Sequence, residues 1–384
     1  MLKKTFRSIF IVLCFSLVSS MAVTAGVNVV RVAILREVDH FALSINGRHM
    51  VLEQAAGKRI STGIRLLPAT VSLEDGKIKI GPTVYDKDRI LIEPRPDADL
   101  KVNDKHFRGN ILIINNNGKT LTVVNFVEIE QYIRGVLYRE VSDKWPMEAI
   151  KAQAVAARTY AVYSMEQFAA RDYDLTNDVS SQVYGGKSGE LYRTNLAVKR
   201  TKGEVLTYKG KVFPSFFHAN SGGMTEAASE LWDVDVLPLK GGIESPYSVN
   251  SPHYRWKLNV RLKDIQDKLN ESGHKIGLIK DIRVVERNKS GRVRRIQITT
   301  RDGQTDFVDG KAFRDILGPN VLKSNMYDVL MRGWYVDFVG HGWGHGVGLC
   351  QWGAYNMARM HFSYKEILSF YYPSSEVIKL NNID

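Results

Sequence analysis

Cysteine is almost absent from this chain, which has only Cys14 and Cys350 among its 384 residues. Two cysteines exclude a small scaffold stapled by disulfides and a metal module built on cysteine ligands. Beyond the N-terminal segment, no stretch approaches the roughly 20 apolar residues of a membrane-spanning helix. We also find no internal repeat and no low-complexity tract. With 44% hydrophobic and 24% charged residues, the composition is that of a globular protein of two or three compact units.

The N-terminal segment has the pattern of an export signal. Lys3, Lys4 and Arg7 precede a long uncharged run, and Val23-Thr24-Ala25 resembles a small-residue cleavage site. We therefore predict a signal peptide over residues 1–25 and an exported mature chain, periplasmic or associated with the cell wall. The alternative is an uncleaved membrane anchor.

The mature chain keeps a positive charge. The formal net charge is +12, and removing the three cations of the signal leaves +9. An exported basic protein meets anionic partners such as the cell wall or lipid headgroups, rather than nucleic acid. Residues 275–301 contain nine Lys or Arg against two acids. This strip is either a solvated surface or a binding strip for an anionic polymer.

Hydrophobic periodicity predicts an α+β fold, with a helix-containing core and β-rich flanking regions. The Ala-rich helix that begins at Pro146 contains six alanines between positions 149 and 161, which allow close approach of other backbone, so we expect it to be central and buried. The expected elements, in chain order, are strands within 27–127, helices over 128–141 and 146–168, strands within 203–218, a helix over 262–270 and a hairpin over 281–300.

Three segments combine residue types that are costly in a core and useful in a cleft. They are REVSDKWPMEAIKAQAVAARTYA from Arg139, FFHANSGGMTE from Phe216 and HGWGHGVGLCQWGA from His341. In the first, Glu140 stands where an apolar helix runs into a loop. A carboxyl group that is partly desolvated there would have a raised pKa and could donate a proton. The alternative is an ordinary surface or capping glutamate.

The other two segments give weaker signals. His341 and His345 are four residues apart, but six glycines between positions 340 and 353 argue against a helix and hence against a helical two-histidine zinc site. The loop could bring backbone N–H groups to a sugar or acyl oxygen, or it could be a tight turn with satisfied histidines. Ser221 lacks the Gly-x-Ser-x-Gly context of a nucleophile, and Cys350 fits a spectator thiol.

Taken together, these segments resemble the stage II sporulation protein D (SpoIID/LytB) family. Weaker matches extend the resemblance over roughly residues 105–380. The matching motifs, in the order and spacing of the family, are Glu140, PMEAIKAQAVAARTY from Pro146, SSQVYGG from Ser180, SGG from Ser221 and HGWGHGVGLCQWGA from His341.

The resemblance implies an exported lytic transglycosylase that cleaves peptide-stripped MurNAc–GlcNAc strands to 1,6-anhydroMurNAc products. It maps the family's catalytic glutamate, a single general acid/base, to Glu140. It implies no cofactor, and the zinc site of some members is not expected here because the mature chain has one cysteine. Substrate-binding roles are predicted for Lys151, Gln153, Arg158, His218, Ser221, His341, His345 and Gln351. The alternative for each is hydrogen bonding within the helices and loops themselves.

The resemblance also implies a domain division and partners. After the signal, we expect a β-rich region over 26–105 and a catalytic region over 106–380, its core at 128–226 completed by the Gly/His loop at 340–354. Expected partners are peptidoglycan glycan strands and a cell-wall amidase, with no nucleic acid and no membrane contact except through an uncleaved signal. The alternative function is a non-catalytic amidase enhancer or wall-binding protein. A peptidoglycan amidase would need zinc ligands or a nucleophile that the sequence does not supply.

Overall fold

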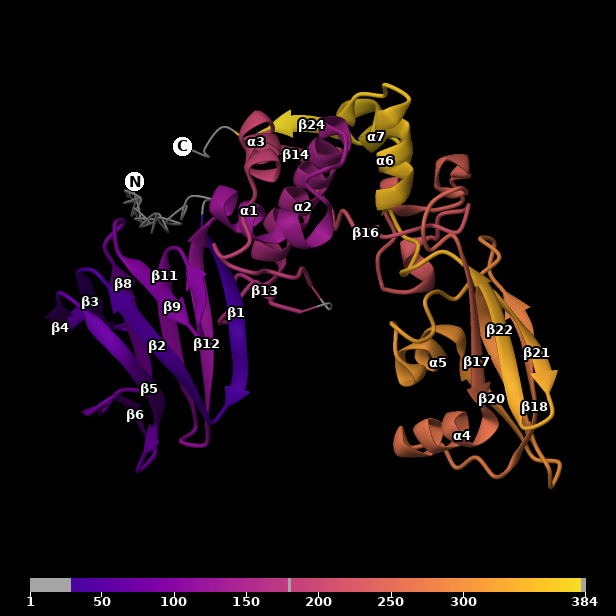
Figure 1. Ribbon diagram of the computed structural model, residues 1–384, viewed down its shortest axis with the longest axis horizontal. Coiled ribbons are helices and arrows are strands. Elements are labelled where there is room, and N and C mark those ends of the chain that lie inside the picture. The colour runs from indigo at the N-terminus through magenta and orange to yellow at the C-terminus, as the bar shows by residue number, and fades with distance from the viewer. Residues whose placement is uncertain (1–28, 179–180, 381–384) are drawn as a thin grey trace, which may run out of the picture.

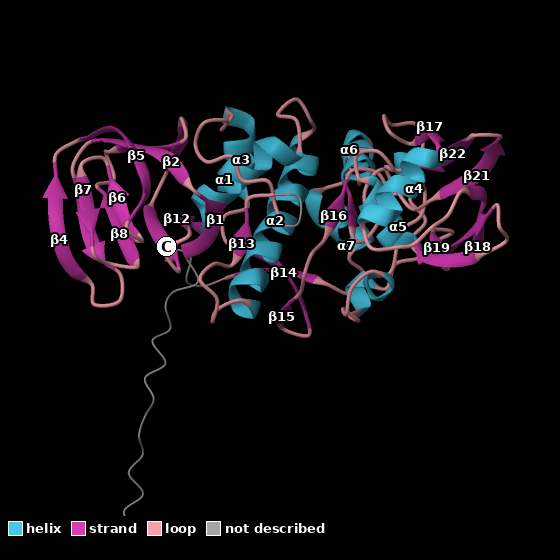
Figure 2. Ribbon diagram, turned by 90° about the horizontal axis from the view of Figure 1, so that it is seen from below, coloured by secondary structure: helices cyan, strands magenta, loops and turns pink. Residues whose placement is uncertain are grey.

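The computed structural model describes residues 29–178 and 181–380, and the expected α+β fold is confirmed. A β-sandwich, a group of helices and a second α+β unit follow one another in a row (Figures 1 and 2). The predicted signal peptide lies outside the described residues. Within those ranges, no helix has the length and apolar character needed to cross a membrane.

Two antiparallel-rich sheets form the N-terminal sandwich and share one apolar core. The first sheet has the order β13 (Leu175–Thr176), β1 (Val29–Val38), β12 (Thr120–Glu128), β11 (Asn110–Asn116), β8 (Arg89–Pro94), β3 (His49–Glu53) and β4 (Lys58–Gly63). The second has the order β10 (Lys105–Phe107), β9 (Asp99–Val102), β2 (His40–Asn46), β5 (Leu66–Glu74), β6 (Lys77–Ile80) and β7 (Thr83–Tyr85).

The predicted hairpin around an Asn-Gly turn is formed by β11 and β12. Asn117 and Gly118 both have positive φ, 56° and 71°, as a two-residue hairpin turn requires. In β11, Ile111 and Ile113 face the sandwich core, whereas Leu112 faces a small cluster on the other side of the sheet. Because β11 and β12 pair with β8 and β1, the sheet continues past the boundary predicted near residue 105.

Three helices follow the sandwich, and the first two were predicted. α1 (Ile129–Glu140) begins where the Glu128 carboxylate accepts the N–H groups of Glu130 and Gln131, each at 3.1 Å. α2 (Met147–Gln167) begins one residue after Pro146, which serves as its N-cap residue rather than its first helical residue. α3 is Tyr192–Arg200.

α2 is buried on several sides, as its alanines predicted. Ile150, Ala154 and Ala157 pack into the core shared with the sandwich, whereas Ala152 and Val155 pack into a second core. Small side chains allow this because they let backbone and helices approach from both sides. α2 is therefore the common wall between two hydrophobic cores.

The second core is closed by the C-terminal end of the chain. β16 (Phe217–His218) pairs in parallel with β23 (Leu349–Cys350), and β14 (Glu204–Tyr208) pairs with β15 (Lys211–Val212) and β24 (Glu376–Lys379). Two helices, α6 (Gln351–Arg359) and α7 (Tyr364–Tyr371), pack on this core. Short 3-10 turns lie at Ala228–Glu230, Leu237–Leu239 and Pro246–Ser248.

The chain between β16 and β23 contains a separate α+β unit with its own core, which we call the inserted unit (residues 255–341). It includes the helix and the hairpin predicted from the sequence. Its elements are β17 (Arg255–Arg261), α4 (Leu262–Glu271), β18 (Ile279–Arg287), β19 (Val293–Thr300), β20 (Thr305–Asp309), α5 (Gly310–Leu317), β21 (Tyr327–Arg332) and β22 (Tyr335–His341).

A buried ion pair ties α1 to α2. Arg158 Nε and Nη2 donate to the two carboxylate oxygens of Glu130 at 2.9 and 2.8 Å, and both residues are buried. Arg158 Nη1 donates to the Glu204 carbonyl at 3.0 Å, and Glu130 accepts the Gly203 N–H at 3.0 Å. The pair thus fixes the start of β14 as well as the two helices.

Arg158→Met should lower the free energy of unfolding by about 3–5 kcal/mol, because it leaves a buried carboxylate without its partner. A urea titration followed by circular dichroism measures this. The matched control is Arg89→Gln, which breaks an equally bidentate but exposed pair with Asp172 and should cost about 1 kcal/mol or less. Equal losses for the two variants would contradict a structural role for the buried pair.

Candidate active site

A cavity of about 820 Å³ lies between the helices and the inserted unit. Its walls come from α1, α2, the strand β16 and its flanks, the Gly/His loop and α5. The lining residues are Glu140, Tyr160, Tyr163, Ser164, Phe168, Ser181, Val183, Pro214, Phe216, Phe217, His218, Ala219, Leu231, Trp232, Val234, Lys311, Arg314, Asp315, Pro319, Asn320, Asn325, Trp343, Gly344, His345 and Gln351.

Glu140 is the last residue of α1, and its carboxyl group faces this cavity. The helix stops there because Val141 is extended, with φ −139° and ψ 150°. Burial raises the pKa of the Glu140 carboxyl, whereas hydrogen bonds from Gln351 and from the backbone of Val183 oppose the rise. The protonated form of Glu140 is thus favoured relative to a carboxyl group in water.

Gln351 reaches Glu140 from the far end of the chain. Its Nε2 donates to Glu140 Oε2 at 3.2 Å and to Gln153 Oε1 at 3.4 Å. It stands at the first position of α6, directly after β23, and Cys350 Sγ accepts the Gly353 N–H at 3.3 Å as the cap. Pairing of β23 with β16 therefore sets the position of Gln351 beside Glu140.

The Gly/His segment begins at the end of β22, is a loop from Gly342 to Gly348 and is a helix from Gln351, so the expectation of no helix as far as Gly353 is wrong. Gly353 lies inside α6, where a Cβ would collide with the Tyr371 hydroxyl. This position of the helix therefore requires glycine. In the loop, Gly344 has φ 110° and lies against the Cβ of His218, so only glycine fits. The histidines of the segment are outside any helix.

His218 and His345 line the cavity as neutral rings with assigned tautomers. His345 donates from Nε2 to the Phe217 carbonyl at 2.9 Å and accepts the Val347 N–H at Nδ1, at 3.1 Å. Burial, with a contribution from nearby Arg314, lowers the pKa of His345 to about 3. His218 donates from Nδ1 to the Val347 carbonyl at 3.0 Å, and burial holds its pKa well below the usual value. These bonds join β16 to the loop and fix the orientation of both rings.

The other five residues expected to bind substrate lie outside the cavity lining. Gln153 is buried behind Gln351, and Arg158 is in the ion pair with Glu130. The remaining three lie as follows: Lys151 Nζ is 2.7 Å from a Glu148 oxygen, Ser221 Oγ is 3.1 Å from Ser248 Oγ, and the His341 ring packs on Tyr254 at 5.3 Å. As direct ligands of a substrate, these residues stay predictions, whereas Gln153 supports Gln351.

Sequence reasoning missed the aromatic lining. Tyr160, Tyr163 and Phe168 come from α2 and its end, and their near-helical spacing in the sequence could have pointed to one face. Phe216 and Trp232 are stacked, with ring centroids 4.2 Å apart and planes 22° apart. Aromatic rings of this kind are suited to contact with the apolar faces of sugars.

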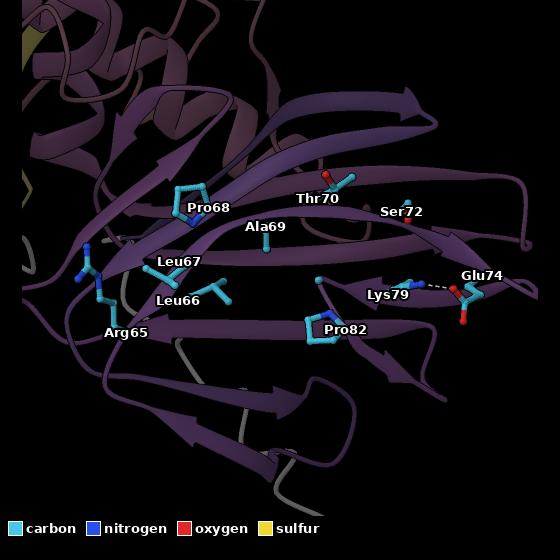
Figure 3. A pocket seen from close by; sticks show the side chains of 11 residues that line it. Arg65, Leu66, Leu67, Pro68, Ala69, Thr70, Ser72, Glu74, Lys79 and Pro82 are labelled. Carbon is cyan, nitrogen blue, oxygen red and sulfur yellow. Dashed lines mark hydrogen bonds and ion pairs between the residues drawn. The ribbon is translucent and has the colours of Figure 1, made fainter.

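A second pocket, of about 730 Å³, lies on the outer face of the sandwich along β5 and β6 (Figure 3). Its lining includes Leu67, Pro68 and Thr70, and the one carboxylate among these described residues, Glu74, is ion-paired with Lys79. Unlike the cavity at Glu140, this pocket has no buried carboxyl group among its described lining residues.

Over residues 29–178 and 181–380, no three His, Cys, Asp or Glu side chains are arranged to hold a metal ion. Cys350 is fully buried, and its Sγ accepts the N–H groups of Ser221 and Gly353, each at 3.3 Å. Burial raises the pKa of this thiol, so it is held as a neutral structural group.

Two families of sequences match parts of the chain. The Stage II sporulation protein family matches residues 117–208, which contain α1, α2 and Glu140. A domain of unknown function matches residues 235–348, which contain the inserted unit. The two matched segments together supply most of the cavity wall.

Similar proteins cover much more of the chain. An uncharacterized protein of Brachyspira hyodysenteriae is 33% identical over 369 residues, which are 94% of this chain and 95% of that protein. The Stage II sporulation protein D of Bacillus amyloliquefaciens is 30% identical over 275 residues, 66% of this chain and 75% of that protein. The amidase enhancer of Bacillus subtilis is 28% identical over 291 residues, 63% of this chain and 40% of that protein.

The order of the motifs and the extent of these matches agree with the fold around Glu140. The match to stage II sporulation protein D runs through three quarters of that protein at 30% identity, well beyond a single motif. This chain belongs to the stage II sporulation protein D family.

Proposed function

We propose that this protein is an exported peptidoglycan lytic transglycosylase with Glu140 as its acid/base. The observation that carries the proposal is a carboxyl group with a raised pKa in a large cavity lined by aromatic rings. A glycan strand offers sugar faces to such rings, and a glycosidic oxygen needs a proton from such an acid. The names of the sporulation and amidase-enhancer relatives support a role at the cell wall.

The reaction needs one carboxyl group. Protonated Glu140 gives its proton to the glycosidic oxygen between MurNAc and GlcNAc as the C1–O bond breaks. The resulting carboxylate takes the proton from the 6-hydroxyl of the same MurNAc, and that oxygen bonds to C1. The product is a 1,6-anhydro sugar, no water is consumed and Glu140 is protonated again. Holding the hydroxyl near C1 replaces a bimolecular attack by an intramolecular one.

A hydrolase would need a second carboxylate. Asp315 also lines the cavity, but it is exposed and pairs with Lys311 at 2.9 Å. Its side chain is 51% exposed, unlike the buried Glu140 carboxyl. The arrangement therefore favours intramolecular transfer over hydrolysis, and the reducing or anhydro end of the product distinguishes the two.

The second candidate is a non-catalytic enhancer of a cell-wall amidase. It is favoured by the 28% identity to the protein named amidase enhancer. In that case the cavity would bind glycan without cleaving it, and Glu140 would be dispensable. Addition of the protein to an amidase assay, with wild type and the Glu140→Gln variant compared, tests this directly.

Glu140→Gln should reduce the release of 1,6-anhydroMurNAc fragments from peptide-stripped strands by about 10²–10⁴-fold, the usual contribution of a general acid/base. Mass spectrometry of soluble products measures the loss. Glu166→Gln is the matched control. Burial also raises the pKa of the Glu166 carboxyl, but Glu166 lies on α2 outside the cavity. Reducing ends in the wild-type products would contradict the transglycosylase and direct attention to Asp315.

Gln351→Leu should move the high-pH decline of activity to higher pH. The Gln351 N–H stabilises ionised Glu140 and lowers its pKa, so removing that bond raises the pKa further and keeps the acid protonated at higher pH. The pH profile of kcat/KM measures the shift. Asn356→Leu, on the same helix but bonded to the Tyr247 carbonyl, should leave the midpoint unchanged. An unshifted profile for Gln351→Leu would remove Gln351 from the acid/base machinery.

A further inference from the structure

The inserted unit contributes a cation to the cavity that Glu140 also lines. Arg314 is on α5, and it lines the cavity together with Glu140 and the stacked pair of Phe216 and Trp232. It is half-buried, and burial lowers the pKa of its guanidinium. A cation in such a place is costly unless an anion or polar groups compensate it.

No carboxylate in the described part of the chain forms an ion pair with Arg314, although the charge of the adjacent Asp315 acts on its guanidinium. No carboxylate oxygen there lies within 4.0 Å of its guanidinium, and the adjacent Asp315 is ion-paired with Lys311 instead. Arg287, Arg108 and Arg158 all have carboxylate partners. Arg292, which is buried and donates to the carbonyls of Met224 and Ser221, also has no such ion pair among the described residues, but it does not line the cavity as Arg314 does.

Backbone carbonyls hold the guanidinium in place. Arg314 Nε donates to the Leu322 carbonyl at 2.9 Å, and Nη2 donates to the carbonyls of Pro319 and Lys323 at 3.3 and 3.1 Å. Nη1 makes no hydrogen bond to the residues that the structure describes, and it is not among the atoms sealed from solvent. The side chain is therefore pre-organised, with donor capacity left for a ligand in the cavity.

We infer that Arg314 binds a carboxylate carried by the glycan in this cavity. The inference rests on the proposed peptidoglycan substrate and deepens it, because it adds a specificity residue from the inserted unit. Each MurNAc carries a lactyl group whose carboxylate is free in stripped strands and amide-linked when a stem peptide is present. The carboxylate bound by Arg314 belongs to the lactyl group or to the stem peptide.

Arg314 lines the cavity, whereas Arg158, which was expected to bind substrate, does not. Arg158 is fully buried against Glu130, so its charge is already neutralised. On α2, Arg158 thus has a structural role, whereas Arg314, which lines the cavity, comes from α5. A charge-assisted bond of this type adds directional selectivity as well as affinity.

Isothermal titration calorimetry in a Glu140→Gln background tests the inference without turnover. The ligands are GlcNAc–MurNAc tetrasaccharides with free lactyl groups, the same tetrasaccharides with stem peptides, and chitotetraose, which has no carboxylate. Arg314→Gln should weaken binding of a carboxylate-bearing ligand by about 10- to 100-fold and leave chitotetraose unchanged. Loss with free lactyl groups assigns that carboxylate, and loss only with peptide-bearing ligand assigns the stem peptide.

Two controls keep the outcome interpretable. Arg287→Gln removes another arginine of the inserted unit, which donates to backbone carbonyls and pairs with Asp328 outside the cavity, and it should leave all three affinities unchanged. Arg314→Lys keeps the charge and should retain part of the selectivity. It provides a second test in case Arg314→Gln folds poorly. Equal weakening for chitotetraose, or no weakening at all, overturns the inference. Absence of anhydro products from the wild type would overturn the proposed function alone.

Discussion

The arrangement of the site depends on the parallel pairing of β16 with β23. Two residue pairs, Phe217 with Leu349 and His218 with Cys350, join segments that are more than 130 residues apart. Because Gln351 follows β23 directly, this short ladder places its amide 3.2 Å from the Glu140 carboxylate. The inserted unit lies in the chain between β16 and β23. The pairing of these two strands therefore also affects its position beside the cavity.

Burial then gives the titratable groups of the cavity different roles. The same loss of water raises the pKa of Glu140 and lowers that of His345 to about 3. Hydrogen bonds from the His345 and His218 rings to backbone groups join the Gly/His loop to β16. Burial favours the protonated form of Glu140 and the neutral forms of the two rings, and the nearby charges of Arg314 and Arg292 add to the effect on His345.

Local signals were sufficient for α1, α2, α4 and the two hairpins, whereas α3, α5, α6 and α7 were not predicted. The helical spacing in α1, the alanines of α2 and the Asn117-Gly118 turn each express a preference that depends on near neighbours in sequence. The residues of the site were harder to predict, because a polar residue in a motif can either bind substrate or hold the fold together. Arg158 and His341 belong to motif segments, yet one neutralises Glu130 and the other packs on Tyr254.

The sequence by itself determined the α+β class, the family motifs and Glu140 as the carboxyl of interest, because each is written in contiguous residues. Only the tertiary structure decided what surrounds that carboxyl. Gln351 comes from a strand pairing and Arg314 from a unit nearly 175 residues away, and no local pattern encodes either contact. The pKa of Glu140 is likewise a property of the closed cavity, since desolvation exists only after distant segments have packed.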